Sequence, residues 1–215
     1  MKREWLLPTG LVLLSFVPVL AGVLRLTELS TGAEVTPANA RFFATPAPVV
    51  VHIIGASVYC VLGAFQFVPR IRRRHPRWHR YAGRVLVVCG LAAALSGIWM
   101  TLTYPLPSHD GPLLNTFRLI FGTTMVVSIV LAFLAIRRHD IATHRAWMMR
   151  GYAIGQGAGT QAVLLGLGSA VFGPPGLLSY ALVMGAAWVL NLVVAEVGIR
   201  RRTVRTPLRV PVAAR

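Results

Sequence analysis

The chain has 215 residues, of which 55% are hydrophobic and only 13% are charged, whereas soluble domains carry about 25% charged residues. This composition, with a mean hydropathy of +0.65, excludes an ordinary soluble enzyme and indicates a helical membrane protein. A net charge of +16 would suggest nucleic acid in a soluble protein. Here we interpret the positive charges as a collar that contacts anionic lipid headgroups of the bilayer, and we expect no nucleic-acid partner.

Six apolar runs follow one another along the chain, and each reaches the roughly 20 residues that a helix needs to cross about 30 Å of hydrocarbon. The runs cover residues 5–26, 48–68, 82–104, 114–136, 147–172 and 176–199. We therefore predict an all-α fold with six transmembrane helices in one domain, residues 1–203. Residues 204–215 form a basic, proline-containing tail, for which we predict disorder.

The distribution of basic residues predicts the orientation of the chain in the membrane, because cytoplasmic loops carry an excess of Lys and Arg. With a cytoplasmic N-terminus, only Arg25, Arg41 and Arg118 fall towards the outer side. That leaves nineteen of the 22 basic residues inside (22 − 3 = 19). Both termini are therefore predicted to be cytoplasmic.

A basic segment occurs twice in the chain, each time between two apolar runs. The first, IRRRHPRWHR, covers residues 71–80, and the second, IRRHDIATHR, covers residues 136–145. His79 and His144 hold equivalent places, 65 residues apart (144 − 79 = 65). The repeat predicts a two-helix hairpin used twice, at about 48–104 and 114–172, that forms a four-helix core with the third and fifth spans diagonally opposite.

A stripe of small and polar residues follows one face of the second predicted span. His52, Gly55, Tyr59, Gly63 and Gln66 are spaced so that they share a helix face. Such a face on a transmembrane helix is directed at protein or at a cavity and not at lipid. His52 and Gln66 are therefore candidate binding residues, although hydrogen bonds to neighbouring helices explain them equally well.

The fifth predicted span carries a GxxxGxxxG series, which lets helix backbones approach closely. The glycines are Gly151, Gly155 and Gly159. A polar face runs beside them, which either lines a cavity or satisfies a neighbouring helix. It consists of Tyr152, Gln156 and Thr160.

Acidic residues are scarce, with only six in the chain. Glu196 is the only one within an apolar run, and we expect it to pair locally with Arg200, four residues later. Neither a phosphate-binding loop nor a Ser-His-Asp set is present, which argues against a nucleotide-driven pump or a hydrolase. A proton-coupled transporter would normally carry a carboxylate in mid-membrane, and the apolar runs carry none there.

The two His-Arg turns are the strongest candidate site. Each turn begins with a histidine and carries a second arginine about 7–9 Å further along its helix. Arginine at that depth snorkels, pairs or holds an anionic group. An interfacial anchor explains the outer arginines better than it explains this duplicated arrangement. The cluster consists of His79, Arg80, Arg84, His144, Arg145 and Arg150.

Several functions fit this cluster. His79 and His144, at one membrane level on diagonal helices, are suited to ligate the iron of a b-type haem, with the arginines on its propionates. Alternatively, the cluster binds a quinone or a lipid headgroup. It could equally dock a membrane-protein partner or a second copy of the chain, which would make the protein a non-enzymatic assembly or scaffold factor. A small-molecule or lipid transporter is a further alternative. Whether the protein is an enzyme stays open.

Four segments together resemble the bacterial predicted membrane proteins called domain of unknown function 2306. The segments are VHIIGA with His52, GAFQFVPRIR with Gln66, HRYAGR from His79 and HRAWMMRGYA from His144. The resemblance covers about residues 48–160 and implies a multi-pass protein of a bacterial inner membrane. It marks the histidines, the glutamine and the arginines of these segments as the positions to test. It implies no substrate, because the family has no established activity.

Overall fold

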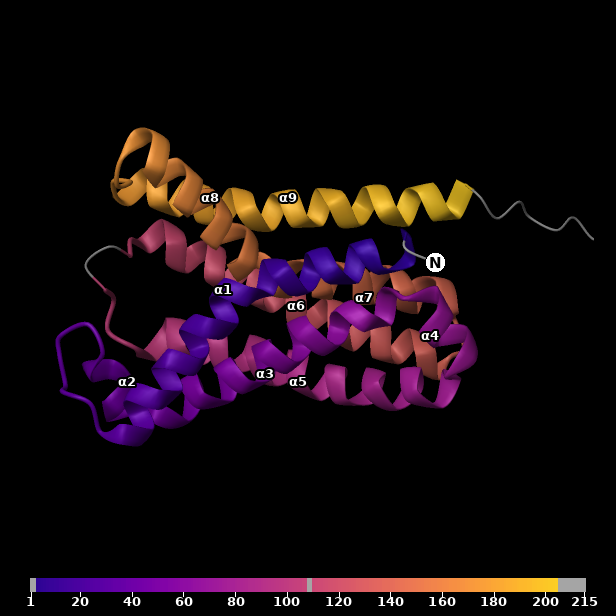
Figure 1. Ribbon diagram of the computed structural model, residues 1–215, viewed down its shortest axis with the longest axis horizontal. Helices are drawn as coiled ribbons and strands as arrows, with labels where there is room; N and C mark the ends of the chain where they lie inside the picture. Colours follow the sequence, from indigo (N-terminus) through magenta and orange to yellow (C-terminus); the bar gives the residue numbers. More distant parts are fainter. Residues whose placement is uncertain (1–2, 108–109, 205–215) are drawn as a thin grey trace, which may run out of the picture.

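The computed structural model describes residues 3–107 and 110–204, and these residues form helices joined by short connections (Figure 1). The predicted disordered tail therefore lies almost entirely outside the described residues. The long helices are α1 (Arg3–Thr31), α3 (Pro46–Ala64), α5 (Pro76–Thr103), α6 (Pro112–Arg137), α7 (Ile141–Gly155), α8 (Gly157–Phe172) and α9 (Leu177–Val204). The short ones are α2 (Ala40–Ala44), η1 (Phe65–Phe67) and α4 (Pro69–Arg74).

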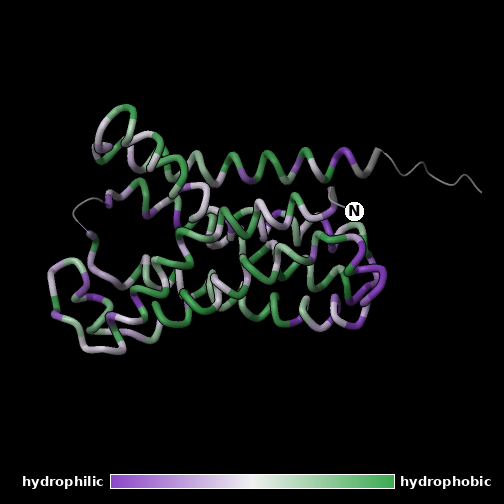
Figure 2. Tube along the Cα trace, viewed as in Figure 1, coloured by the Kyte–Doolittle hydropathy of each residue, from purple (hydrophilic) through white to green (hydrophobic). Residues whose placement is uncertain are grey.

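Within the described part of the chain, 5 helices are long and apolar enough to cross a membrane. They cover Glu4–Thr31, Pro46–Phe67, Pro76–Thr103, Pro112–Arg137 and Leu177–Arg201. Apolar residues fill the middle of the bundle, and hydrophilic residues gather at its ends, most densely around α4 (Figure 2). The all-helical, multi-pass membrane architecture is thereby confirmed.

The predicted fifth span is not one helix. It is divided at Gln156 into α7, with 15 residues, and α8, with 16 residues, and each is shorter than the roughly 20 residues of a spanning helix. Gly155 and Gly157 flank the break, and glycine favours a helix interior less than other residues do, except proline. The count of six spans therefore stays a prediction.

Side chains from other helices stabilise the break. Asn191 Nδ2 donates to the carbonyl oxygen of Ala153 at 3.1 Å, and the Cys60 thiol donates to that of Gly155 at 3.3 Å. Backbone carbonyls that lose their helical partners inside a membrane must be satisfied within the protein, and these two side chains do so. The polar face predicted beside the glycines also forms hydrogen bonds with a neighbouring helix. The Tyr152 hydroxyl donates to the carbonyl oxygen of Cys60 at 2.6 Å.

Four of the long helices, α3, α5, α6 and α7, pack in a ring. Helix α3 lies against α5, α5 against α6, and α6 against α7, while α7 also contacts α3. This order places α5 and α7 across the ring from each other. Helices α1 and α9 lie outside the ring, α1 against α3 and α8, and α9 against α7 and α8. The internal duplication stays a prediction, because the first hairpin contains the extra helix α4 and the second does not.

The core is built from aromatic rings set against glycines. The Tyr59 ring fills the space beside Gly90 and Gly155, where a Cβ atom would come within 2.7 Å and 2.8 Å of it. The Tyr152 ring lies against Gly63 in the same way. The small and polar stripe of the second span is therefore directed at protein, as predicted, and the glycine series of the fifth span serves close packing.

The bundle has two distinct ends (Figure 1). The basic end holds the start of α1, helix α4 and the end of α9, and α4 alone has the sequence PRIRRR. The opposite end holds α2, the α5–α6 connection and the α8–α9 connection.

Candidate functional site

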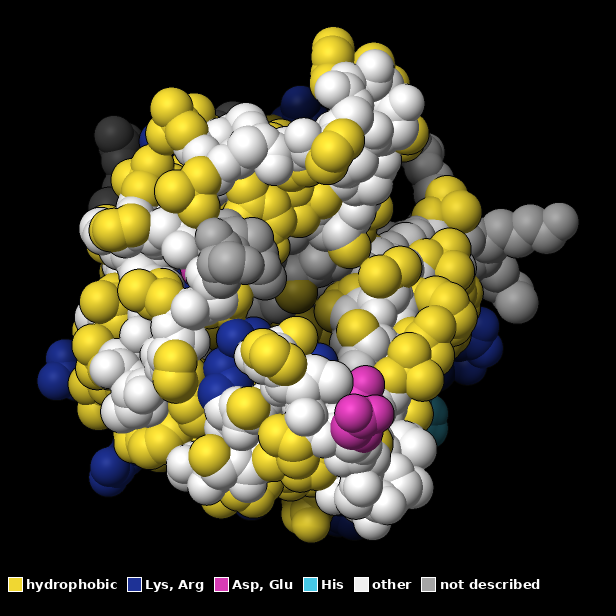
Figure 3. All heavy atoms as spheres, turned by 90° about the vertical axis from the view of Figure 1, so that its left-hand side faces the viewer, with side chains coloured by type: hydrophobic (Ala, Val, Ile, Leu, Met, Phe, Trp, Pro, Cys, Tyr) yellow, Lys and Arg dark blue, Asp and Glu magenta, His cyan; other side chains and the backbone are white. Residues whose placement is uncertain are grey.

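A cavity of about 410 Å³ opens at the end of the bundle opposite the basic end. Cavities that bind small molecules usually measure about 300–1,000 Å³. Seen from this end, the molecule is hollowed near its centre, and cationic side chains lie at the edge of the hollow (Figure 3). Helices α2, α3, α5, α6, α7, α8 and α9 all contribute residues to its wall.

Two arginines stand at the mouth of the cavity. Arg118 donates from Nη1 to Asp110 Oδ2 at 2.5 Å and to Asn115 Oδ1 at 3.2 Å, which fixes its guanidinium at the rim. The guanidinium of Arg41 lies 4.6 Å from the centre of the Phe42 ring. Burial lowers the pKa of Arg41, while the nearby Asp110 carboxylate opposes that shift. The mouth thus offers more positive than negative charge to a ligand.

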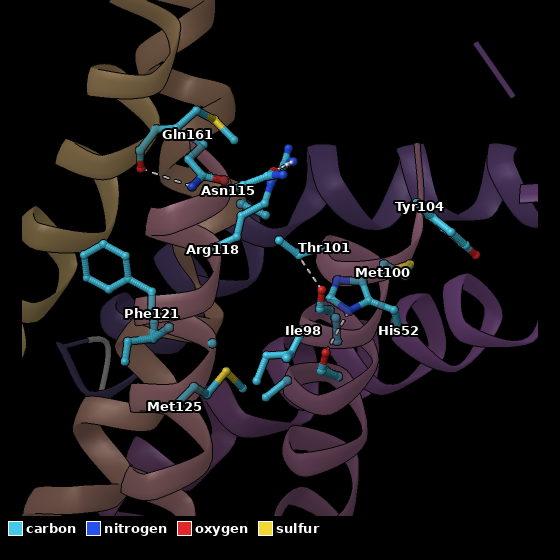
Figure 4. A pocket seen from close by; sticks show the side chains of 18 of the residues that line it. His52, Ile98, Met100, Thr101, Tyr104, Asn115, Arg118, Phe121, Met125 and Gln161 are labelled. Atoms are coloured by element: carbon cyan, nitrogen blue, oxygen red, sulfur yellow. Dashed lines mark hydrogen bonds between the residues drawn. The ribbon is translucent and has the colours of Figure 1, made fainter. Parts of the chain in front are cut away.

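His52 forms part of the wall between α3 and α5 (Figure 4). Its Nδ1 lies 2.8 Å from the carbonyl oxygen of Ala93 and 3.4 Å from Ser96 Oγ. A carbonyl oxygen only accepts, so Nδ1 carries the proton and, in the neutral ring, Nε2 is an acceptor. The histidine is held in one orientation by its backbone partner and presents an acceptor nitrogen.

The deeper wall of the cavity is apolar. Phe121 and Trp188 stack with their ring centres 4.9 Å apart, and Met125 lies one turn below Phe121. Tyr59 and Cys60 form the floor. The Tyr59 side chain is 1% exposed, and its hydroxyl has no hydrogen-bond partner in the protein.

The predicted His-Arg cluster lies at the basic end, away from the cavity. His144 Nδ1 donates to the carbonyl oxygen of Ala132 at 2.9 Å. His79 Nδ1 is buried and has no hydrogen-bond partner in the protein. The two imidazoles lie near enough to interact electrostatically, so the fold brings these histidines of α5 and α7 to one region.

The arginines of the cluster are arranged less uniformly. Arg80 and Arg84 are exposed, and Arg145 is half-buried. Arg150 is fully engaged, because its Nε and Nη2 donate to the two carboxylate oxygens of Glu196 at 2.5 Å and 3.2 Å.

Glu196 does not pair with Arg200, and that expectation is wrong. Helix α9 packs against α7, so the carboxylate meets Arg150 across the helix interface and Arg200 acts on it only electrostatically. The guanidinium of Arg150 also lies 4.5 Å from the centre of the Trp147 ring.

The structure divides the predicted binding residues between two regions. His52 lines the cavity, whereas His79 and His144 lie at the basic end. Gln66 lies in η1 next to α4, and its Nε2 is buried without a hydrogen-bond partner in the protein. Among the described residues, no group of three or more His, Cys, Asp or Glu side chains is placed to hold a metal ion.

Sequence reasoning missed the mouth of the cavity. Arg41 and Arg118 were recognised only as two of the few basic residues on the predicted outer side. Their rarity was the available signal. An arginine on the outer side is not part of the predicted cytoplasmic collar, so a different function has to explain its position.

Comparison with known proteins identifies a family that the chain matches. The family model described as a predicted membrane protein (DUF2306) matches residues 49–199, which is 151 of the 215 residues (199 − 49 + 1 = 151). No curated protein matches, and no solved structure matches.

Proposed function

The chain belongs to the family of predicted membrane proteins DUF2306, and we propose that it binds a small amphipathic anion in the cavity between its helices. We place the mouth of this cavity on the outer face of a bacterial inner membrane, with both termini in the cytoplasm. The distribution of basic residues supports that orientation, since it sets nineteen of 22 on the inner side.

The observation that carries the proposal is the pairing of a cationic mouth with an apolar interior. Arg41 and Arg118 flank the mouth, and the stacked rings of Phe121 and Trp188 form the wall behind it. Ligand sites of this kind are mostly apolar, with a few placed polar groups that fix the orientation of the ligand. Guanidinium groups suit a carboxylate or phosphate, because their planar donors match the oxygens of these anions.

One further group inside the cavity adds a polar contact. The Nε2 atom of His52 is a hydrogen-bond acceptor, because Nδ1 carries the proton in its contact with the Ala93 carbonyl. A ligand with an anionic head and an apolar body that carries a small donor group would engage the mouth, the wall and His52 together.

Binding is tested with the purified protein in nanodiscs, with octanoate as the probe and octanol as its uncharged counterpart. We expect octanoate to bind more tightly than octanol, and Arg41→Gln or Arg118→Gln to weaken octanoate at least about tenfold, or 1.4 kcal/mol. Arg73→Gln is the control, because Arg73 is exposed on α4 at the basic end and does not line the cavity. Equal binding of both probes would contradict an anion site.

A second variant tests the location of the ligand. Ala158 lines the cavity and is exposed to it, so Ala158→Phe fills the space without displacing the core. Val163 is on the same helix, 47% exposed, and does not line the cavity, so Val163→Phe is the control. Octanoate binding that survives Ala158→Phe would place the ligand elsewhere.

A second candidate function is haem or quinone binding at the basic end. The observation that favours it is the buried, unpartnered Nδ1 of His79 beside His144, whose own Nδ1 is held by the carbonyl of Ala132. A histidine that is oriented by a backbone carbonyl keeps Nε2 for an iron atom, as in many metal sites.

The haem proposal is tested by the absorption spectrum of protein made with added haem. We expect a low-spin spectrum that is lost in His79→Ala and in His144→Ala and kept in His75→Ala and His139→Ala. Absence of a Soret band would exclude haem, and a quinone analogue that stabilises the wild type but not the histidine variants would then support a quinone site. Variants that lose only a co-purifying membrane protein would favour a scaffold function.

A further inference from the structure

Three arginines lie near the mouth of the cavity, and two of them are already neutralised by carboxylates. Arg118 pairs with Asp110 at 2.5 Å, and Arg25 pairs with Glu28. Both of these arginines act electrostatically on Arg41, which forms no ion pair with an acidic side chain of the described residues. With three guanidiniums and two carboxylates, this region carries one excess positive charge (3 − 2 = 1).

This balance of charge suits a ligand head with a single negative charge. A carboxylate would neutralise Arg41 and leave the two existing ion pairs in place. A phosphate monoester carries a charge of about −1.5 to −2 at pH 7. Its second charge would face the carboxylate of Asp110, which lies close enough to Arg41 to act on it, and like charges side by side are unfavourable.

Gln161 of α8 presents a hydrogen-bond acceptor in the wall of the cavity. Its side chain is only 5% exposed, and it lines the cavity. Nε2 donates to the backbone carbonyl oxygen of Met184 at 3.2 Å. A carbonyl oxygen only accepts, so this contact fixes which end of the amide is the nitrogen. The other end, Oε1, has no hydrogen-bond partner among the described residues.

The two acceptors of the cavity, His52 Nε2 and Gln161 Oε1, are thus both oriented by backbone carbonyls, and they come from different helices (Figure 4). The imidazole of His52 can also take up a proton at Nε2, whereas an amide oxygen stays an acceptor at every pH. Gln161 therefore depends on a donor from water or from a ligand. A purely apolar ligand would cover this oxygen without a donor, which costs about 1–3 kcal/mol.

We propose that the cavity selects monocarboxylates whose apolar body carries a hydroxyl group, and that Gln161 determines this specificity. Arg41 binds the carboxylate, and the hydroxyl of the ligand donates to Oε1 of Gln161. A second hydroxyl, where the ligand has one, donates to Nε2 of His52. The inference rests on the proposed function, since it specifies the ligand of the same cavity.

The first test compares ligands on the purified wild-type protein in nanodiscs. The probes are octanoate, octyl phosphate, and 3-hydroxyoctanoate and 8-hydroxyoctanoate, which carry the hydroxyl at opposite ends of the apolar body. We expect one of the hydroxy acids to bind about tenfold more tightly than octanoate, or 1.4 kcal/mol. Octyl phosphate should bind no more tightly than octanoate. In Asp110→Asn, which releases Arg118 from its ion pair, octyl phosphate should gain affinity relative to octanoate.

The second test removes the acceptor. Gln161→Met keeps the length of the side chain, so it should abolish the preference for the hydroxy acid and bind octanoate more tightly than the wild type. Ser169→Ala is the control, because Ser169 is an exposed polar residue on the same helix and does not line the cavity. It should keep the preference of the wild type.

Three results would overturn the inference and leave the proposed function intact. These are octanoate binding that neither hydroxyl improves, a preference for the hydroxy acid that survives Gln161→Met, and octyl phosphate binding more tightly than octanoate. Absence of octanoate binding in the wild type would overturn the proposed function together with this inference. The comparison of ligands on the wild type decides the matter even where Gln161→Met fails to fold.

Discussion

The two ends of the bundle use arginine in different ways. At the cavity end, Arg118 is fixed by Asp110 and Asn115 and is directed at a hollow of about 410 Å³. At the basic end, most arginines of α4 and of the start of α5 are exposed. The difference lies in the surroundings of the side chains. The exposed arginines of the basic end fit the predicted collar on lipid headgroups, whereas Arg118, held by its partners, fits the proposed role of presenting charge to a ligand.

Between these ends, the bundle depends on shape and not on charge. Glycines of α5, α7 and α8 admit aromatic rings and neighbouring backbone at distances that no other residue would allow. The comparison therefore predicts large effects in the middle, moderate effects where charges are paired, and small effects where they are exposed.

The largest expected difference between the two ends of the bundle is in their accessibility to a labelling reagent, since the topology decides which side of the membrane each end faces. Val35 is 59% exposed in the α1–α2 connection, and Arg74 is exposed at the end of α4. In intact cells, a membrane-impermeant maleimide should label Val35→Cys and leave Arg74→Cys unlabelled until the cells are permeabilised. The reverse pattern would turn the cavity towards the cytoplasm and remove the support for an external ligand.

The next largest effect is expected for Gly159→Leu. A Cβ atom at Gly159 would lie 2.2 Å from the carbonyl oxygen of Leu14, and backbone does not move aside as a flexible side chain does. The variant should lose stability at or above the ~1–3 kcal/mol typical of overpacking, measured as yield and unfolding temperature. Gly166→Leu on the same helix is the control, because Gly166 has no atom within 4 Å of that position. Equal tolerance of both substitutions would refute the close contact of α1 with α8.

A moderate effect is expected for the Arg150–Glu196 pair, which joins α7 to α9. Arg150→Ala or Glu196→Ala should each destabilise the protein by about 1–2 kcal/mol, because each leaves a partly buried charge unpaired beside Trp147. The double variant should lose less than the sum of the two, as measured by a double-mutant cycle. Arg84→Ala, at an exposed arginine, should stay within about 0.5 kcal/mol of the wild type.

The smallest effect is expected for Asp140, which caps the N-terminus of α7. Its carboxylate accepts from the Thr143 amide at 3.0 Å, and the hydrogen bonds with Thr143 lower the pKa of Asp140. A lowered pKa in the folded state stabilises the protein above the unfolded value of about 3.9, and the effect is lost as the pH falls through the folded value. Asp140→Asn should therefore change little at pH 7 and flatten the fall in unfolding temperature between pH 5 and pH 3. An unchanged acid profile would show that other carboxylates control it.

Continuous apolar runs made most of the fold predictable. The predicted spans 48–68 and 114–136 correspond to Pro46–Phe67 and Pro112–Arg137, because hydrophobicity alone fixes where a helix meets lipid. The break at Gln156 was not predictable from the fifth span itself. It depends on Asn191 and Cys60, which reach it from helices far away in the sequence.

The candidate site was predictable only in part. The periodic face of the second span was predicted to be directed at protein or at a cavity, and His52 on that face lines the cavity. The rest of the cavity has no such period, since its wall combines side chains from seven helices. The sequence instead predicted a site at the duplicated His-Arg turns. A repeat can be recognised from the sequence alone, whereas a cavity formed by several helices cannot.

The break between α7 and α8 also bears on how the chain enters the membrane during synthesis. Each of these helices is only about 22–24 Å long, so neither crosses the hydrocarbon alone. Of the two side chains that satisfy the carbonyls at the break, Cys60 has already left the ribosome when α7 emerges, whereas Asn191 belongs to α9, which is made after α8. The α7–α8 segment therefore reaches its final structure only after α9 has been translated, and insertion of this part of the bundle is completed from its C-terminal side.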